Sequence, residues 1–139
     1  MESFRRGGRQ FILDGAHNPI SAKELVRSLR SPLYTPGVYK GASAWLVFGA
    51  MNDKNSRGML KILSGFFSKV ILSGIAGNRA KPVAMLVNEA KGLFKCVLTA
   101  QNVEEAFGLA RGAASPGASI VVTGSFYLVG EARRILKHG

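Results

Sequence analysis

Cysteine and histidine are scarce in this chain of 139 residues, which has one cysteine, Cys96, and two histidines, His17 and His138. One cysteine cannot form an internal disulfide, and Cys96 lies in an apolar run where we expect a buried small side chain. So few metal ligands also exclude a zinc site of the usual type. Because a chain without disulfides suits a reducing compartment, we expect a cytoplasmic protein.

Long apolar runs and nucleotide-binding signatures are absent as well. No apolar stretch reaches the roughly 18 residues that span a bilayer, and no secretory segment opens the chain, so no membrane partner is expected. The sequence has neither the G-x-x-x-x-G-K-[ST] phosphate loop nor a G-x-G-x-x-G turn after a strand. Its own motifs therefore predict neither hydrolysis of a nucleoside triphosphate nor dinucleotide binding.

Acidic residues are few, with eight Asp and Glu against nineteen Lys and Arg, and the net charge is +11. This net charge creates a positive electrostatic field that attracts anions. Nucleotides, polyglutamates and nucleic acids are all compatible with it as partners. The basic residues are spread along the chain rather than gathered in one tract with aromatic side chains between them, so a nucleic-acid partner is not expected. They include Arg5, Arg6, Arg9, Arg27, Arg30, Arg57, Lys61, Arg79, Arg111, Arg133 and Arg134.

Extended and helical patterns alternate along the chain. We expect strands at residues 1–6, 9–13, 42–50, 69–73, 95–99 and 119–123, the first two joined by a tight turn at Gly7-Gly8. Helices are expected from the Asn18 cap to residue 31, along an apolar stripe from 59 to 67, from Pro82, from the Asn102 cap, and over 126–137. In the third helix, the inward residues are predicted to be Val83, Leu86, Val87 and Ala90.

This alternation predicts one open α/β domain over residues 1–139. Each crossover helix returns the chain to the same sheet, so the strands after the opening β-ribbon are expected to be parallel. The fold class is Rossmann-like, with a mostly parallel sheet flanked by helices. Residues 35–41 are expected to form a surface loop because of their proline and glycine content.

Polar residues gather where the predicted parallel strands end, which is where ligands bind in such sheets. The densest group follows the first parallel strand, with Asp14, His17 and Asn18 at a strand-to-helix turn. Gly15 allows a ligand to approach the backbone closely. A capped turn with a surface histidine is the alternative, since Asn18 by itself could satisfy the helix N-terminus.

Three later strand ends carry further candidates. Asp53 and Lys54 follow the second parallel strand and Arg79 follows the third, whereas Thr123-Gly124-Ser125 follows the last. A hydroxyl beside free backbone N–H groups suits a carboxylate or phosphate. The segment Asn52-Asp53-Lys54-Asn55 could equally be a helix cap with a solvated charge pair.

Four segments in order resemble the C-terminal domain of folylpolyglutamate and dihydrofolate synthases, within the Mur ligase superfamily. They are Ile12–Pro19 (ILDGAHNP), Val47–Lys54 (VFGAMNDK), Asn78–Ala80 (NRA) and Val121–Glu131 (VVTGSFYLVGE). The first and last are the most specific to this branch. The resemblance covers essentially the whole chain and implies the Mur ligase C-terminal fold.

The resemblance implies an ATP-dependent ligase that phosphorylates a folate or pteroate carboxylate and joins it to glutamate. In that family, ATP and Mg²⁺ are bound mainly by an N-terminal domain, and the catalytic cleft lies between the two domains. By position, His17 and Ser125 would bind the carboxylates of L-glutamate, with Asn18 beside them. Asp14 would orient the amine of glutamate or the ribose of the nucleotide. No catalytic residue and no metal ligand is assigned within the chain.

The N-terminal ATP-binding domain is expected to be absent, and an arginine of the family would fall just ahead of Met1, so negligible turnover is expected from the chain alone. Two alternatives stay open, namely the C-terminal domain of another Mur-type amino-acid ligase and a stand-alone polyanion-binding module. The sequence leaves open whether the enzyme makes dihydrofolate, polyglutamates or both.

Overall fold

A β-ribbon opens the chain in the computed structural model, which describes residues 1–31 and 44–138. Strand β1 (Glu2–Arg6) pairs antiparallel with β2 (Arg9–Leu13). The turn between them has positive φ at both Gly7 (58°) and Gly8 (76°), a conformation that glycine adopts without steric cost. The predicted hairpin is confirmed.

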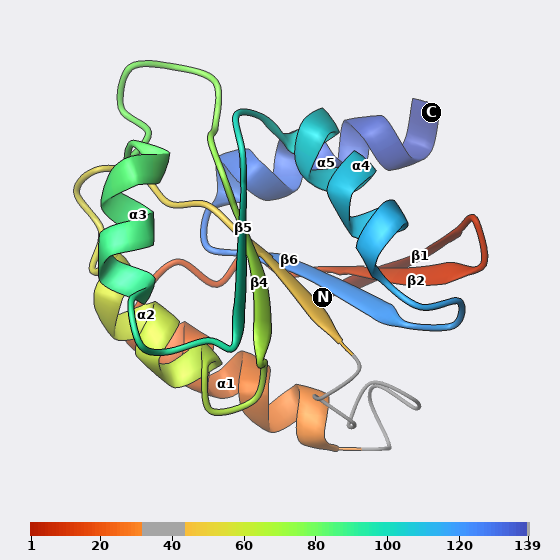
Figure 1. Cartoon of the computed structure of the whole chain (residues 1–139), viewed down its shortest axis with the longest axis horizontal. Helices are drawn as coiled ribbons and strands as arrows, with labels where there is room; N and C mark the ends of the chain where they lie inside the picture. The colour runs from red at the N-terminus through yellow and green to blue at the C-terminus, as the bar shows by residue number, and fades with distance from the viewer. Residues whose placement is uncertain (32–43, 139) are drawn as a thin grey trace.

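Strand β2 also belongs to a six-stranded sheet with the order β1-β2-β6-β3-β4-β5 (Figure 1). The other strands are β3 (Trp45–Phe48), β4 (Lys69–Ser73), β5 (Cys96–Ala100) and β6 (Ser119–Thr123). From β2 to β5 every neighbouring pair is parallel. The last strand of the chain, β6, is therefore inserted between the first parallel strand and the second.

In the described part of the chain, five helices cover the two faces of this sheet. They are α1 (Pro19–Arg30), α2 (Ser56–Leu63), α3 (Val83–Ala90), α4 (Val103–Ala113) and α5 (Phe126–His138). Figure 1 shows α1, α2 and α3 together on one side and α4 and α5 on the other, as the two core clusters require. The chain moves outward from β2 to β5 through the first three helices and returns to β6 through α4. Right-handed crossovers demand this change of face.

The core lies on both sides of the sheet because successive strand residues point to opposite faces. In β6, Val121 packs with α1 and α2, whereas Ile120 and Val122 pack under α4 and α5. All three are fully buried. The apolar run of this strand therefore reflects burial on two faces.

Asparagine caps fix the starts of three helices. Asn18 accepts from the Ser21 N–H at 2.8 Å, Asn55 from the Gly58 N–H at 3.0 Å, and Asn102 from the Glu105 N–H at 2.9 Å. An oxygen on the residue before the first turn satisfies a backbone N–H that has no partner inside the helix. The caps predicted at Asn18 and Asn102 are confirmed.

Helix α2 is shorter than the predicted apolar stripe, which extended to residue 67. The helix ends at Leu63, and the side chain of Ser64 donates to the Lys61 carbonyl at 2.7 Å. Gly65 follows, and both residues weaken a helix at this point. Phe67 is still fully buried, so the apolar pattern correctly predicted burial beyond the end of the helix.

Two predicted core positions are more exposed than expected. Val87 is 38% exposed, because α3 turns Leu86 and Ala90 toward the sheet and a residue one step from Leu86 is rotated by about 100°. Cys96 is only half-buried, since β5 is an edge strand whose side chains alternate in exposure.

The expected strand at 42–50 is observed only at Trp45–Phe48, and residues 42 and 43 lie outside the described part of the chain. The loop expected at 35–41 also lies outside it. None of the helices in the described ranges is long and apolar enough to cross a membrane.

Candidate functional site

Four loops meet at the carboxyl edge of the sheet, after β2, β3, β4 and β6. Together they line a cavity of about 270 Å³. Its lining residues are His17, Met51, Asp53, Lys54, Arg79, Gly124, Ser125, Phe126 and Tyr127. Five of the seven site residues predicted from the sequence line this one cavity, although they lie up to 108 positions apart along the chain, from His17 to Ser125.

The loop after β2 places His17 at the cavity wall. The Asp14 carboxylate accepts from the Ala16 N–H at 3.0 Å and closes a tight turn. His17 Nδ1 lies 3.1 Å from the Gly15 carbonyl oxygen. Because a carbonyl oxygen only accepts, this contact places a proton on Nδ1, and in the imidazolium form Nε2 also carries a proton that can be donated to a carboxylate.

The aromatic ring of Phe126 supports His17 from the start of α5. The two ring centroids are 4.8 Å apart with an interplanar angle of 39°. Gly15 lies under the same ring, and a Cβ there would come within 2.6 Å of it. Phe126 and Tyr127 are 64% and 60% exposed, so the wall that they form faces outward.

The end of β6 packs directly on the turn after β2. The Gly124 N–H donates to the Ala16 carbonyl at 3.0 Å, and the Thr123 hydroxyl donates to the same oxygen at 3.4 Å. Ser125 follows with 2% exposure, and its Oγ accepts from the Tyr127 N–H at 3.0 Å. These bonds hold Ser125 and His17 at the same cavity.

The loops after β3 and β4 bring charge to the opposite wall. The Asn52 N–H donates to the Arg79 carbonyl at 2.7 Å, and Met51 and Ala80 form a short antiparallel bridge. The cavity thereby receives the cations of Lys54 and Arg79 and the carboxylate of Asp53. Two cations, an imidazole and a hydroxyl can bind carboxylates, and one carboxylate can accept from an amine.

Asp14 and Asn18 do not line this cavity. Asp14 borders an adjoining hollow of about 430 Å³, which it shares with His17 and Phe126. The side-chain oxygen of Asn18 is engaged in the cap of α1, where it accepts from both the N–H and the hydroxyl of Ser21. The dense group predicted after β2 is thus divided among a cavity wall, a turn and a helix cap.

The family model described as Mur ligase, glutamate ligase domain, matches residues 1–126. The chain belongs to this family. No curated protein matches it.

Solved structures with the same fold support the assignment of the chain to this family. The structure of Mycobacterium tuberculosis folylpolyglutamate synthase complexed with ADP is similar over 99% of this chain, with 28% identity and a TM-score of 0.84. The bifunctional folylpolyglutamate synthase/dihydrofolate synthase of Yersinia pestis, complexed with AMPPNP and Mn, is similar over 96%, with 25% identity and a TM-score of 0.80. A structure of such a bifunctional enzyme with Mn, AMPPNP and L-glutamate bound has the same values.

The chain spans about a third of the length of these relatives, with coverage of 32%, 30% and 30%. The sheet order, the β-ribbon and the helices on both faces are accordingly those of the Mur ligase C-terminal domain. The fold class predicted from the sequence is confirmed.

A divalent metal does not fit the residues of this Mur ligase domain by themselves. Mg²⁺ prefers about six oxygen ligands, and the cavity offers one carboxylate, Asp53, beside two cations. Nowhere in residues 1–31 and 44–138 do three or more His, Cys, Asp or Glu side chains gather to hold an ion.

The sequence did not reveal a larger cavity of about 470 Å³ at the ends of β4 and β5. Helices α3 and α4 leave these neighbouring strands toward opposite faces, which opens a crevice between them. Its lining includes Lys81 and Glu105. Strand order creates this crevice, and strand order cannot be read from local patterns.

Proposed function

We propose that this chain is the glutamate-binding domain of an ATP-dependent folylpolyglutamate/dihydrofolate synthase. The observation that carries the proposal is the convergence of His17, Ser125, Lys54 and Arg79 on one cavity in a member of the Mur ligase family. Similarity to a folate ligase structure with L-glutamate bound supports the choice of amino acid. ATP and Mg²⁺ would be held mainly by a domain outside these 139 residues, and the reaction would take place in the cytoplasm.

The reaction would proceed in two steps. The γ-phosphoryl group of ATP passes to a carboxylate of a folate or pteroate, which gives an acyl phosphate and ADP. The amine of glutamate then attacks the acyl carbon, inorganic phosphate leaves, an amide bond forms, and the amine loses a proton.

The chain's own residues would hold glutamate for that attack. Lys54 and Arg79 would pair with the carboxylates of glutamate, which is the role that suits a point charge and a guanidinium fork. The Ser125 hydroxyl and His17 would complete this binding, and Asp53 would accept from the ammonium before it loses its proton. Asp14, in the adjoining hollow, would accept from a ribose hydroxyl of the nucleotide.

Titration of the isotope-labelled chain with L-glutamate, followed by nuclear magnetic resonance, tests the proposal. We expect saturable shifts of the His17, Lys54, Gly124 and Ser125 amides with an affinity on the order of 1 mM. His17→Ala and Ser125→Ala should each weaken binding about tenfold, or about 1.4 kcal/mol. Unchanged affinity in both variants would refute the assigned roles.

Matched controls separate binding from folding. Ser125→Ala also removes the oxygen that accepts at the start of α5, so Asn102→Ala, which removes the cap of α4, should cost similar stability of about 1 kcal/mol without weakening binding. His138→Ala removes an exposed imidazole at the far end of α5 and should leave the affinity unchanged.

Other ligands distinguish the two alternatives. Preference for a different amino acid, such as D-glutamate, L-alanine or L-aspartate, would indicate another Mur-type ligase. Binding of random duplex DNA without any response to amino acids would indicate a polyanion-binding module.

A further inference from the structure

A buried lysine, Lys81, lies at the junction of the two loops that carry charge to the cavity. It follows the Arg79 loop directly and is only 6% exposed, although lysine is rarely buried without a partner. Its main-chain N–H donates to the Ala50 carbonyl at 2.8 Å, which joins the loop after β4 to the end of β3. Lys81 does not line the cavity that holds His17 and Ser125, so the proposed function leaves it without a role.

The ammonium of Lys81 uses all three of its donors. It donates to the Lys54 carbonyl at 3.2 Å, to Glu89 Oε2 at 3.2 Å and to the Ser56 hydroxyl oxygen. The Ser56 hydroxyl in turn donates to Glu89 Oε1. An ammonium has three donors and no acceptor, so this set satisfies it completely.

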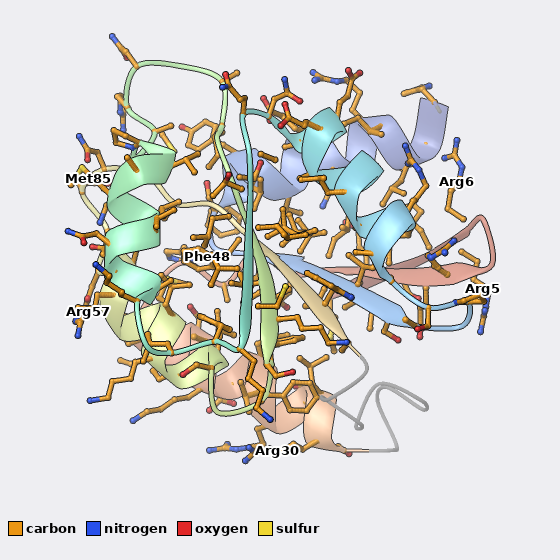
Figure 2. The ribbon with its side chains drawn as sticks, in the orientation of Figure 1. Arg5, Arg6, Arg30, Phe48, Arg57 and Met85 are labelled. Atoms are coloured by element: carbon orange, nitrogen blue, oxygen red, sulfur yellow. The ribbon has the colours of Figure 1, made fainter. Side chains whose placement is uncertain are left out.

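The partners of Lys81 come from three elements. Lys54 lies in the loop after β3, Ser56 is the fully buried first residue of α2, and Glu89 is in the last turn of α3. Arg57, labelled in Figure 2, adds a bond from α2 to the Glu89 carbonyl at 3.3 Å. The Lys81 cluster, defined as Lys81, Ser56 and Glu89, therefore joins the start of α2 and the last turn of α3 to the loop after β3.

We propose that Lys81 is a positioning residue, which holds the backbone of Lys54 and Arg79 in the place from which their side chains reach the cavity. The hydrogen bond to the Lys54 carbonyl holds the loop after β3. The loop after β4 is held because Lys81 lies only two residues from Arg79 along the chain. The Asn52 to Arg79 hydrogen bond of 2.7 Å lies between these two points and depends on both. The effect of Lys81 on the geometry of the two loops does not depend on what the cavity binds, whereas its effect on glutamate affinity rests on the proposed function.

Amide hydrogen exchange of the 139-residue chain tests the effect on the loops. Lys81→Met keeps the length and apolar stem and removes the three donors. We expect the Asn52 amide to exchange about tenfold faster in this variant, because its bond to Arg79 opens locally. Amides of β6 should keep their protection, and an unchanged Asn52 rate would overturn the proposal.

Conservative and destabilised variants distinguish positioning from general stability. Lys81→Arg retains the charge and the donors that face Glu89, so it should restore part of the Asn52 protection. Leu86→Ala removes a fully buried side chain of α3 outside the Lys81 cluster and should lower overall stability without selective exchange at Asn52. Equal acceleration at Asn52 in Leu86→Ala would mean that Lys81 acts only through stability.

Glu89→Gln provides a second route if Lys81→Met fails to fold. It keeps the shape and removes the charge that faces Lys81, so it should accelerate Asn52 exchange to a smaller extent. If the wild-type chain binds L-glutamate, Lys81→Met should weaken that binding about fivefold to tenfold, and Lys81→Arg should recover it. If the wild-type chain does not bind L-glutamate, the proposed function fails and the exchange experiment still decides the role of Lys81.

Discussion

At Gly124 the backbone turns from β6 into α5 with a φ of +120°, next to the carbonyl of Gly49 and the ring of Phe48. Phe48 lies near the centre of the molecule in Figure 2. A Cβ at position 124 would collide with the Gly49 oxygen and lie 2.9 Å from the Phe48 ring. Only glycine allows the loop before Ser125 to pass this close to β3.

Gly124→Ala should therefore destabilise the domain by about 2–3 kcal/mol, from backbone strain together with the displaced Phe48 ring. Urea unfolding followed by circular dichroism measures this loss. Gly108→Ala is the matched control, because Gly108 lies in α4 with nothing within 4 Å of an added Cβ. That substitution should stabilise the domain by roughly 0.5–1 kcal/mol, and equal effects of both would contradict the explanation.

The residues of the cavity differ in how well the sequence predicted them. His17, Lys54, Arg79 and Ser125 could be found because each lies just after a predicted strand, and all parallel strands end at one edge. Phe126 and Tyr127 were expected only as the start of a helix, since no local pattern indicates that an aromatic residue will stand beside His17. Lys81 was missed because a lysine after a loop is normally exposed.

At the scale of elements, Glu2 and Arg133 join the β-ribbon to α5. Arg133 Nε donates to Glu2 Oε1 at 2.6 Å, and both side chains are about 40% exposed. The hydrogen bond from Arg133 lowers the pKa of the Glu2 carboxyl below its usual value of 4.5, with smaller contributions from nearby positive charges. A carboxyl with a lowered pKa stabilises the folded state above its unfolded pKa, and this contribution disappears as the pH falls through the folded value.

Glu2→Gln should therefore make stability less sensitive to acid. We expect the wild-type chain to lose more stability than the variant between about pH 6 and about pH 3. The difference should shrink in high salt, because the pair is exposed and screened. Thermal unfolding at the two pH values measures it, with Glu24→Gln on α1 as a variant from another exposed ion pair. Parallel pH profiles for wild type and Glu2→Gln would count against this explanation.

The sequence predicted the existence and type of every described element, and boundaries failed where backbone chemistry competed with the apolar pattern. Helix α2 ends early because Ser64 and Gly65 interrupt it, although Phe67 beyond it is still buried. The prediction that Val87 faces inward was wrong. The spacing of apolar residues identifies an apolar stripe on a helix, but it does not show which residues lie at the centre of that stripe. Local rules thus predict elements better than their ends or edges.

At the scale of the whole molecule, the positive charge is spread over separate regions. In Figure 2, Arg5 and Arg6 lie at the β-ribbon on the right, Arg57 lies on the left on α2, and Arg30 lies at the bottom on α1. A groove for nucleic acid would gather such residues along one path. The charge of +11 is better described as a general attraction for small anions.

We therefore expect no saturable binding of random duplex DNA below about 100 µM protein at about 150 mM salt, measured by fluorescence anisotropy. The double variant Arg5→Gln and Arg6→Gln, which removes two of the three arginines at the ribbon tip and leaves Arg9, should behave like the wild type. Tight binding that falls steeply and linearly with the logarithm of salt concentration would favour the polyanion-binding alternative instead.

The position of β6 has a consequence for how the molecule is assembled. Its five residues are made last among the strands, yet they separate β2 from β3 and hydrogen-bond to both. Until they are available, the ribbon and the β3-β4-β5 sheet each present an unpaired inner edge, which is a template for other chains. A polypeptide that stopped before Ser119 would keep those edges exposed and lack both Gly124 and Ser125, so one C-terminal segment completes both the sheet and the cavity.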